Sequence, residues 1–111
     1  MLFKAKSKYV RISPYKLRPY VVVIRGETVN KALAWLKTHK VKRTKPIEKV
    51  IFSAYSNAKN MQKDILMENL YIKEICVDQG PIVKYFKPAA MGRAAMQRKK
   101  LSHLKVVLER R

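Results

Sequence analysis

Cysteine and histidine are scarce in this chain, and their scarcity argues against two kinds of site. Cys76 is the only cysteine among 111 residues, so no disulfide can form within the chain, and a reducing compartment is its natural setting. Because Cys76 lies in an apolar run, we predict a buried, inert thiol. The only histidines, His39 and His103, belong to no motif of closely spaced zinc ligands. We therefore expect no metal site and no cofactor.

The sequence also lacks the signatures of catalysis and of membrane insertion. It contains no nucleophile motif, no glycine-rich phosphate loop and no paired carboxylates at a recognisable site, so we expect no enzymatic activity. No stretch approaches the length of a membrane span, and the N-terminus lacks the apolar segment of a secretory signal. We expect the protein to work in the compartment where it is made.

Acidic residues are few, and this shortage is the most informative one. Asp and Glu total 7 against 26 Lys and Arg, which leaves a formal net charge of +19. The hydrophobic content of 48% is enough for a core, so we expect one folded domain over residues 1–111. A small domain with so much like charge repels itself unless a polyanion neutralises it. Lys- and Arg-rich surfaces bind phosphate backbones by releasing counterions, which favours nucleic acid over an anionic membrane.

The charges are also unevenly distributed along the chain. Residues 1–26 and 79–108 contain no acidic residue, whereas four of the seven acids fall between residues 64 and 78. This asymmetry predicts two contact surfaces separated by a solvent-facing or strand-pairing region. The basic residues of the two stretches are Lys4, Lys6, Lys8, Arg11, Lys16, Arg18 and Arg25 in the first, and Lys84, Lys87, Arg93, Arg98, Lys99, Lys100 and Lys105 in the second.

The N-terminal quarter predicts one strand and one helix. Residues 3–11 alternate between an apolar face of Phe3, Ala5, Ser7 and Tyr9 and a basic face, which indicates a strand. A basic strand face can also be simply solvated, or can protect a sheet edge from aggregation. Ser13-Pro14 then predicts the start of a helix that stops at Gly26. Because Pro19 lacks an N–H, we expect a kink or a delayed start there.

The middle of the chain predicts two further helices and the beginning of a sheet. A helix is expected from about Thr28, followed by a basic loop over residues 39–45, and Pro46 is expected to open the longest helix. Residues 64–69 are read as a linker, residues 70–77 as a strand, and residues 104–108 as the packed part of another strand. The expected apolar stripe of the longest helix consists of Ile47, Val50, Ile51, Ala54, Ala58 and Met61.

The segment between these strands, residues 80–100, has neither helical nor strand periodicity and contains two prolines. A connection this long is uncommon in a small domain unless it is functional. If it forms a two-stranded arm, each side of roughly ten residues extends about 30 Å. Inside RNA its basic side chains can bind phosphates and its aromatic rings can stack on bases. The alternative is a disordered basic loop, which the interspersed apolar residues make less attractive.

Two polar residues outside this arm have open roles in the sequence. Asn57 lies off the apolar stripe of the longest helix, so it is either solvated or hydrogen-bonded to RNA or to an adjoining loop. His103 is read as an RNA-facing or strand-packing residue.

Several short motifs resemble one known family. They run in family order along nearly the whole chain: Arg11-Ile12-Ser13-Pro14-Tyr15-Lys16-Leu17-Arg18, Ile24-Arg25-Gly26, Lys49-Val50-Ile51-Phe52-Ser53-Ala54, Asn57-Ala58, Val77-Asp78-Gln79-Gly80-Pro81, Gly92-Arg93-Ala94 and Ser102-His103-Leu104. Together they resemble the large-subunit ribosomal protein twenty-two family (L-twenty-two).

The resemblance implies an α+β fold, with three helices packed on a small antiparallel three-stranded sheet and a long protruding β-hairpin at about residues 80–100. It implies a structural protein of the large ribosomal subunit that binds rRNA and supports assembly, and whose hairpin tip lines the nascent-peptide exit tunnel. The implied partners are large-subunit rRNA, neighbouring ribosomal proteins and the nascent peptide, with the chain monomeric within a cytoplasmic, most simply bacterial, ribosome; an organellar ribosome is the alternative.

Charge and resemblance together predict the site residues. The predicted rRNA-binding residues are Lys6, Lys8, Arg11, Lys16, Arg18, Arg25, Lys84, Lys87, Arg93, Arg98, Lys99, Lys100 and His103. The predicted tunnel tip is Lys84, Tyr85, Phe86, Lys87, Pro88, Ala89, Ala90, Met91, Gly92 and Arg93. This tip departs from the family pattern, because Tyr85, Ala89 and Met91 stand where basic residues are usual, and it is therefore less basic and more apolar than expected.

Three other classes of protein were weighed against this reading. A DNA-architectural protein is also small and basic and carries β-arms, but such proteins are usually dimers, and no self-complementary helical interface is visible here. A membrane-active protein needs a basic amphipathic helix, whereas the charges here fall on strands and the arm. An RNA-modifying enzyme has no visible site. A preference for structured RNA over duplex DNA at matched salt would distinguish an rRNA-binding protein from a DNA-architectural protein.

Overall fold

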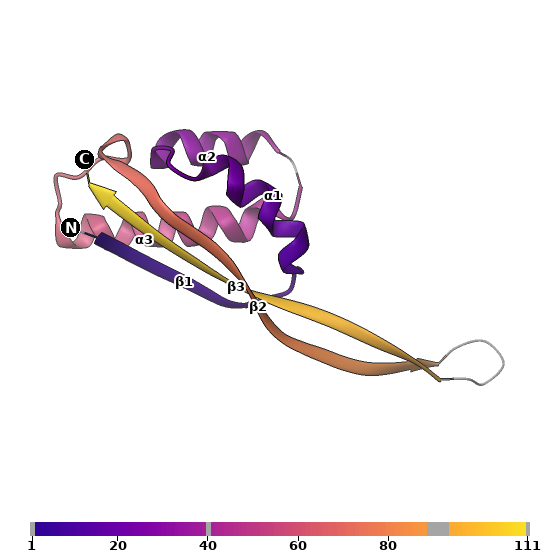
Figure 1. Ribbon diagram of the computed structural model, residues 1–111. Coiled ribbons are helices and arrows are strands. Elements are labelled where there is room, and N and C mark those ends of the chain that lie inside the picture. Colours follow the sequence, from indigo (N-terminus) through magenta and orange to yellow (C-terminus); the bar gives the residue numbers. More distant parts are fainter. Residues whose placement is uncertain (1, 40, 89–93, 111) are drawn as a thin grey trace.

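The computed structural model describes residues 2–39, 41–88 and 94–110, and it shows an elongated molecule with extents of 63, 25 and 18 Å. A body of helices and strands occupies one end, and a two-stranded arm extends from the other (Figure 1). The elements are β1 (Leu2–Val10), α1 (Pro14–Ile24), α2 (Val29–Thr38), α3 (Thr44–Met61), a short 3-10 helix η1 (Met67–Asn69), β2 (Leu70–Pro88) and β3 (Ala94–Arg110).

The three strands form one antiparallel sheet in the order β1-β3-β2. In the body the central strand β3 pairs on both sides, so that Leu108 lies opposite Phe3 of β1 and Ile72 of β2. Beyond the body only β2 and β3 continue, from the pair Ile82 and Lys100 to the pair Pro88 and Ala94. The predicted α+β fold with a protruding hairpin is confirmed.

A β-bulge marks the root of the arm. Pairing moves from Gln79 opposite Ser102 to Ile82 opposite Lys100, so Gly80 and Pro81 lie across from the single residue Leu101. A Cβ atom on Gly80 would lie 3.1 Å from the Leu101 carbonyl oxygen, so this close approach of two backbones favours glycine. The bulge therefore separates a sheet that packs on helices from a hairpin that does not.

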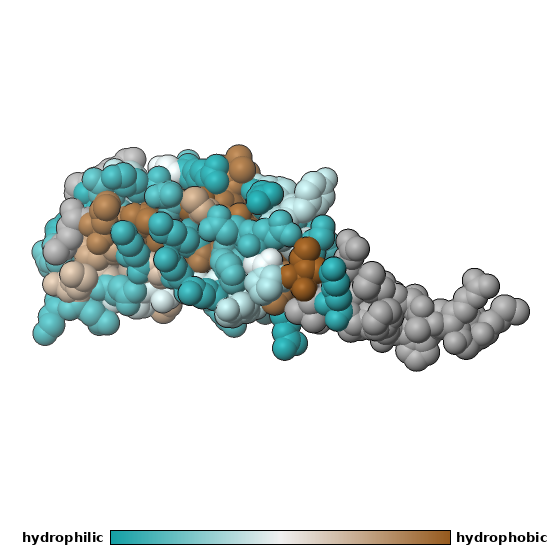
Figure 2. Space-filling model, turned by 60° about the horizontal axis from the view of Figure 1, so that its bottom comes forward, coloured by the Kyte–Doolittle hydropathy of each residue, from teal (hydrophilic) through white to brown (hydrophobic). Residues whose placement is uncertain are grey.

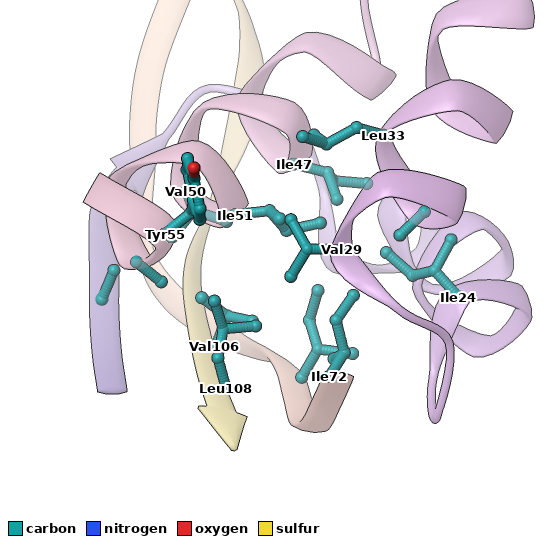
Figure 3. Packing of buried hydrophobic residues seen from close by; sticks show 14 of the residues in the cluster. Ile24, Val29, Leu33, Ile47, Val50, Ile51, Tyr55, Ile72, Val106 and Leu108 are labelled. Carbon is teal, nitrogen blue, oxygen red and sulfur yellow. The ribbon is translucent and has the colours of Figure 1, made fainter. Parts of the chain in front are cut away.

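All three helices cover the same side of the body sheet and enclose one core (Figures 1 and 3). In Figure 3, Ile47 and Ile51 of α3 face Val29 of α2, while Val106 and Ile72 close the core from the sheet. The helical spacing of apolar residues brings these side chains to one face of each helix, and burying them drives the packing.

The first helix begins at Pro14, as predicted, without the delayed start that Pro19 led us to consider. Pro19 is exposed and lies inside the helix, whose buried side chains are carried by the opposite face. The helix ends at Ile24, and Gly26 adopts φ +79°, the left-handed conformation expected of a glycine stop.

Four sequence predictions about the body need correction. The third helix starts at Thr44 rather than Pro46, because the buried Thr44 hydroxyl donates to the Val41 carbonyl oxygen (3.0 Å) and closes the turn before it. Met61 ends the helix 62% exposed, outside the core. The linker predicted over residues 64–69 contains η1 and the fully buried Ile65. Cys76 is half-buried rather than buried.

Tyr9 also leaves the apolar face predicted for β1. The register between β1 and β3 slips between Ser7 and Val10, and Tyr9 adopts φ +59° and is 61% exposed. Its N–H donates to Nδ1 of His103 (3.1 Å), and the two rings meet edge to face. Only Phe3 and Ala5 of the predicted face are buried.

Candidate nucleic-acid interface

The exposed side of β1 carries lysines without acidic partners. Lys6 and Lys8 are exposed, as the alternation predicted, and Lys6 lies directly opposite Lys105 of β3. Like charges in directly opposed positions of two strands destabilise a sheet. An anionic partner would remove this repulsion, so the pair favours phosphate contact over simple solvation.

A basic hollow of about 390 Å³ lies beside the root of the arm. It is lined by Arg11, Ile12, Ser13, Lys16, Lys42, Arg43 and Lys100. Four stretches of chain meet there: the segment that follows β1, the first turn of α1, the α2–α3 connection and, on β3, Lys100 in the first residue pair of the arm beyond the bulge. Figure 1 shows all of them at the end of the body from which the arm departs. Five of the seven lining residues are cationic and none is acidic.

Only part of this hollow was predicted from the sequence. Arg11, Lys16 and Lys100 were predicted to bind rRNA, and the structure brings these three together. Lys42 and Arg43 were predicted only to belong to a basic loop. Their separation in sequence from the other three residues concealed the cluster, and the only signal was the absence of acids from residues 39–45.

Two of the predicted rRNA-binding arginines donate hydrogen bonds that support the fold. The Arg25 guanidinium donates from Nε and Nη2 to the Ile75 carbonyl oxygen (3.2 and 3.1 Å), and Arg18 donates from Nη2 to the Val77 carbonyl oxygen (3.3 Å). Just before these positions, Ile72 exchanges backbone hydrogen bonds with the α1–α2 connection, from Gly26 N–H (3.0 Å) and to the Glu27 carbonyl oxygen (2.8 Å). Together these bonds cover the outer edge of β2 within the body.

The two polar residues with open roles both make contacts within the protein. Asn57 Nδ2 donates to the Lys4 carbonyl oxygen (3.1 Å), which ties α3 to the outer edge of β1. His103 accepts from the Tyr9 N–H through Nδ1, so its ring packs across the strands. For His103 the strand-packing alternative is therefore the one that the structure supports.

The arm is described mainly by its backbone. Lys84 is exposed and pairs with Arg98, Val83 pairs with Lys99, and Lys87 pairs with Ala95. Residues 89–93, which include Ala89, Ala90, Met91, Gly92 and Arg93 of the predicted tip, lie outside the described residues. So do the side chains of Tyr85, Phe86, Lys87, Pro88, Arg98 and Lys99. The predicted contacts of these side chains remain predictions.

The acidic residues make their ion pairs at the end of the body away from the arm. Within residues 2–39, 41–88 and 94–110 there are two such pairs, Lys73 with Glu109 (3.5 Å) and Arg110 with Asp64 (3.7 Å). The Tyr71 hydroxyl donates to Glu109 Oε2 (2.7 Å), and this hydrogen bond, together with Lys73, lowers the pKa of Glu109. The arm-facing end is left strongly cationic.

The described residues offer little for other chemistry. They contain no group of three His, Cys, Asp or Glu side chains that could hold a metal ion. Partial burial and the nearby Glu74 and Asp78 raise the pKa of Cys76, which keeps the thiol protonated and poorly nucleophilic. Among the helices described, none has the length and apolar character needed to cross a bilayer. Figure 2 shows a face of the body on which hydrophilic side chains separate smaller apolar patches.

Comparison with known proteins gives a consistent result. The family model described as ribosomal protein L22p/L17e matches residues 5–109. A "large ribosomal subunit protein uL22" from Desulfitobacterium hafniense strain DCB-2 is 48% identical over 105 residues, covering 95% of this chain and 91% of the relative. Proteins of the same name from Halothermothrix orenii (42% identical, 95% and 92% covered) and Bdellovibrio bacteriovorus (43% identical, 98% of both covered) match over similar lengths.

Proposed function

Because this chain belongs to the ribosomal protein L22p/L17e family, we propose that it is a structural protein of the large ribosomal subunit that binds rRNA through its body and its arm. The proposed setting is the cytoplasmic ribosome of a bacterium, since the relatives compared are bacterial. Its partners are then large-subunit rRNA and neighbouring ribosomal proteins. No catalytic step is part of the proposal.

The observation that carries this proposal is the arm together with the charge at its root. Beyond Gly80 and Pro81, β2 and β3 pair only with each other, and no helix of the body covers them in Figure 1. An isolated two-stranded hairpin is marginal in water, so a partner is expected to stabilise it. The basic hollow at its root favours an anionic partner, and RNA supplies both phosphates and stacking surfaces.

The rRNA-binding residues that we propose differ from the predicted set. Lys6, Lys8, Arg11, Lys16, Lys84 and Lys100 are exposed and available, and Lys87, Arg93, Arg98 and Lys99 are retained on the sequence argument alone. We assign Arg18, Arg25 and His103 mainly to the fold because their polar atoms contact the protein itself. The finer proposal, that the tip over residues 84–93 lines the nascent-peptide tunnel, is supported by the family resemblance and by the reach of the arm.

Sedimentation tests the proposal. A tagged protein is expected to co-sediment with the large ribosomal subunit through a sucrose gradient in high salt. Loose electrostatic binding weakens steeply as salt rises, whereas an arm enclosed in RNA is retained. Protein at the top of the gradient, or with DNA, would overturn the proposal in favour of the architectural alternative.

Deletion of residues 84–93 separates the roles of body and arm. Val83 pairs with Lys99, so residues 94–98 can close the shortened hairpin as a loop without disturbing the bulge or the body. The deleted protein is expected to fold and to bind the subunit, with a changed passage of nascent peptides through the tunnel. Unfolding of this variant would show that the arm is part of the folding unit.

A further inference from the structure

The basic hollow is the strongest feature that the family assignment does not explain. Its five cations are exposed, and within the part of the chain that the structure describes none of their side chains hydrogen-bonds or forms an ion pair. By contrast, Arg18 of α1 and Arg25, directly after it, donate hydrogen bonds to carbonyl groups of β2. The fold therefore brings five cations without partners among the described residues together in the hollow, whereas the nearby Arg18 and Arg25 stabilise β2.

Buried hydroxyl groups hold both walls of the hollow. Ser102 is fully buried and its Oγ donates to the Ile12 carbonyl oxygen, which attaches the segment carrying Arg11 to β3 two residues from Lys100. Thr44 is buried as well, and its hydroxyl donates to the Val41 carbonyl oxygen, which closes the turn that carries Lys42 and Arg43. These are the two buried polar side chains of the described residues.

This coincidence matters because a buried polar side chain needs a partner and carries a cost when it lacks one. The hydroxyl groups of Ser102 and Thr44 both fix segments that carry the cations of the hollow. The charges are thus held close together before any ligand binds, although like charges at short range repel one another. A preorganised site loses less conformational entropy on binding.

We propose that the basic hollow is a binding site for a stretch of RNA backbone that presents several phosphates at the root of the arm. The inference rests on the proposed rRNA function and names a specific contact within it. Five cations without an acid exceed what one singly charged phosphodiester neutralises, so the ligand brings several phosphates into one place. Lys100 belongs to the first residue pair beyond the bulge, so filling the hollow also fixes the arm at its origin.

The test compares two double variants of the whole protein on purified bacterial large-subunit rRNA. Lys42→Gln with Arg43→Gln removes two charges from the hollow. The matched control, Lys31→Gln with Lys63→Gln, removes two exposed lysines near the opposite end of the body. Each phosphate contact contributes roughly 0.7 to 0.9 to the slope of log affinity against log salt. The hollow variant is expected to lower that slope by about 1.5 and the affinity at 0.1 M salt by at least about tenfold, well beyond the control.

The outcomes separate the two proposals. Failure of the unaltered protein to prefer large-subunit rRNA over duplex DNA at matched salt would overturn the proposed function. Normal binding by the unaltered protein, with equal losses in hollow variant and control, would overturn the hollow site alone. If the hollow variant fails to fold, Lys16→Gln serves instead, since Lys16 lines the hollow and is exposed. Its slope is expected to fall by about 0.7 to 0.9, and an unchanged slope overturns the inference.

A second measurement uses no RNA at all. Inorganic tripolyphosphate is titrated into the isotope-labelled protein, and backbone amide shifts are recorded by NMR. A built site predicts saturable shifts concentrated at residues 11–16, 41–43 and 100. Shifts of equal size at every lysine-rich segment would show diffuse electrostatic attraction and overturn the site.

Discussion

Arg25 offers the sharpest test of how this protein divides its basic residues between folding and binding. We predict that Arg25→Met destabilises the body and leaves the rRNA contacts intact. The substitution keeps an unbranched side chain of similar reach but removes the two N–H groups that donate to the Ile75 carbonyl oxygen. It leaves that carbonyl at the outer edge of β2 with water as its only replacement partner.

The size of the expected loss in stability follows from the kind of hydrogen bond that Arg25 makes. Hydrogen bonds from a charged group contribute about 1.5 to 3 kcal/mol to stability. Arg25 is exposed, so solvent competition reduces this to about 1 to 1.5 kcal/mol. For a chain of this size, such a loss lowers Tm by about 4 to 8 °C. Arg18 makes a single, longer bond to Val77, so Arg18→Met is expected to cost less.

The assay pairs a thermal melt followed by circular dichroism with the salt dependence of rRNA binding. Arg25→Met is expected to lower Tm with little change in the salt slope, whereas Arg43→Met is expected to do the reverse. Arg25→Lys retains the charge but cannot reproduce the two-pronged donation, so it should also lose stability. An unchanged Tm for Arg25→Met, with the salt slope reduced by about 0.7 to 0.9, would refute the assignment of Arg25 to the fold.

Two further predictions concern the other edge of the sheet and its response to acid. Asn57→Ala removes the amide that donates to the Lys4 carbonyl oxygen, and urea unfolding should show a loss of about 1 kcal/mol in the free energy of unfolding. Asn57→Gln, whose amide lies one methylene further from the backbone, should not restore the bond. Tyr71→Phe removes the hydrogen bond that lowers the pKa of Glu109. A carboxyl group whose pKa is lowered by folding stabilises the native state above its ordinary pKa, and that contribution disappears as pH falls through the lowered value. The difference in stability between the unaltered protein and Tyr71→Phe should therefore be present at pH 7 and shrink below about pH 4.5; a difference independent of pH would contradict this account.

The sequence predicted those features that depend on local patterns. The three helices follow from apolar residues at helical spacing, and the stop at Gly26 follows from its freedom to adopt a positive φ. An arm was indicated by an indirect observation, a basic segment too long and too apolar for an ordinary loop, and the family resemblance implied that this arm is a β-hairpin. Each of these predictions depends on residues a few positions apart in the sequence or on the length of a segment.

The misreadings have a different physical origin, since each depends on a partner far away in the chain. Ile65 is buried in the common core, formed by residues of the helices and the sheet, although its own segment has no periodicity. Tyr9 turns outward because β1 and β3 slip in register, which the alternation of one strand cannot reveal. Lys42 and Arg43 join the hollow only through the tertiary arrangement.

The same limit applies to charge, where it matters most for function. Arg11, Arg18 and Arg25 are indistinguishable in a count of basic residues, and all three were predicted to bind rRNA. In the structure, Arg18 and Arg25 face open carbonyl groups at the outer edge of β2, while Arg11 faces a hollow lined by other cations. A cation with a carbonyl partner stabilises the fold, and a cation held among cations raises the energy of the free protein. That unfavourable energy is relieved only when an anion binds, so the residues that weaken the isolated protein are the ones expected to give it affinity for RNA.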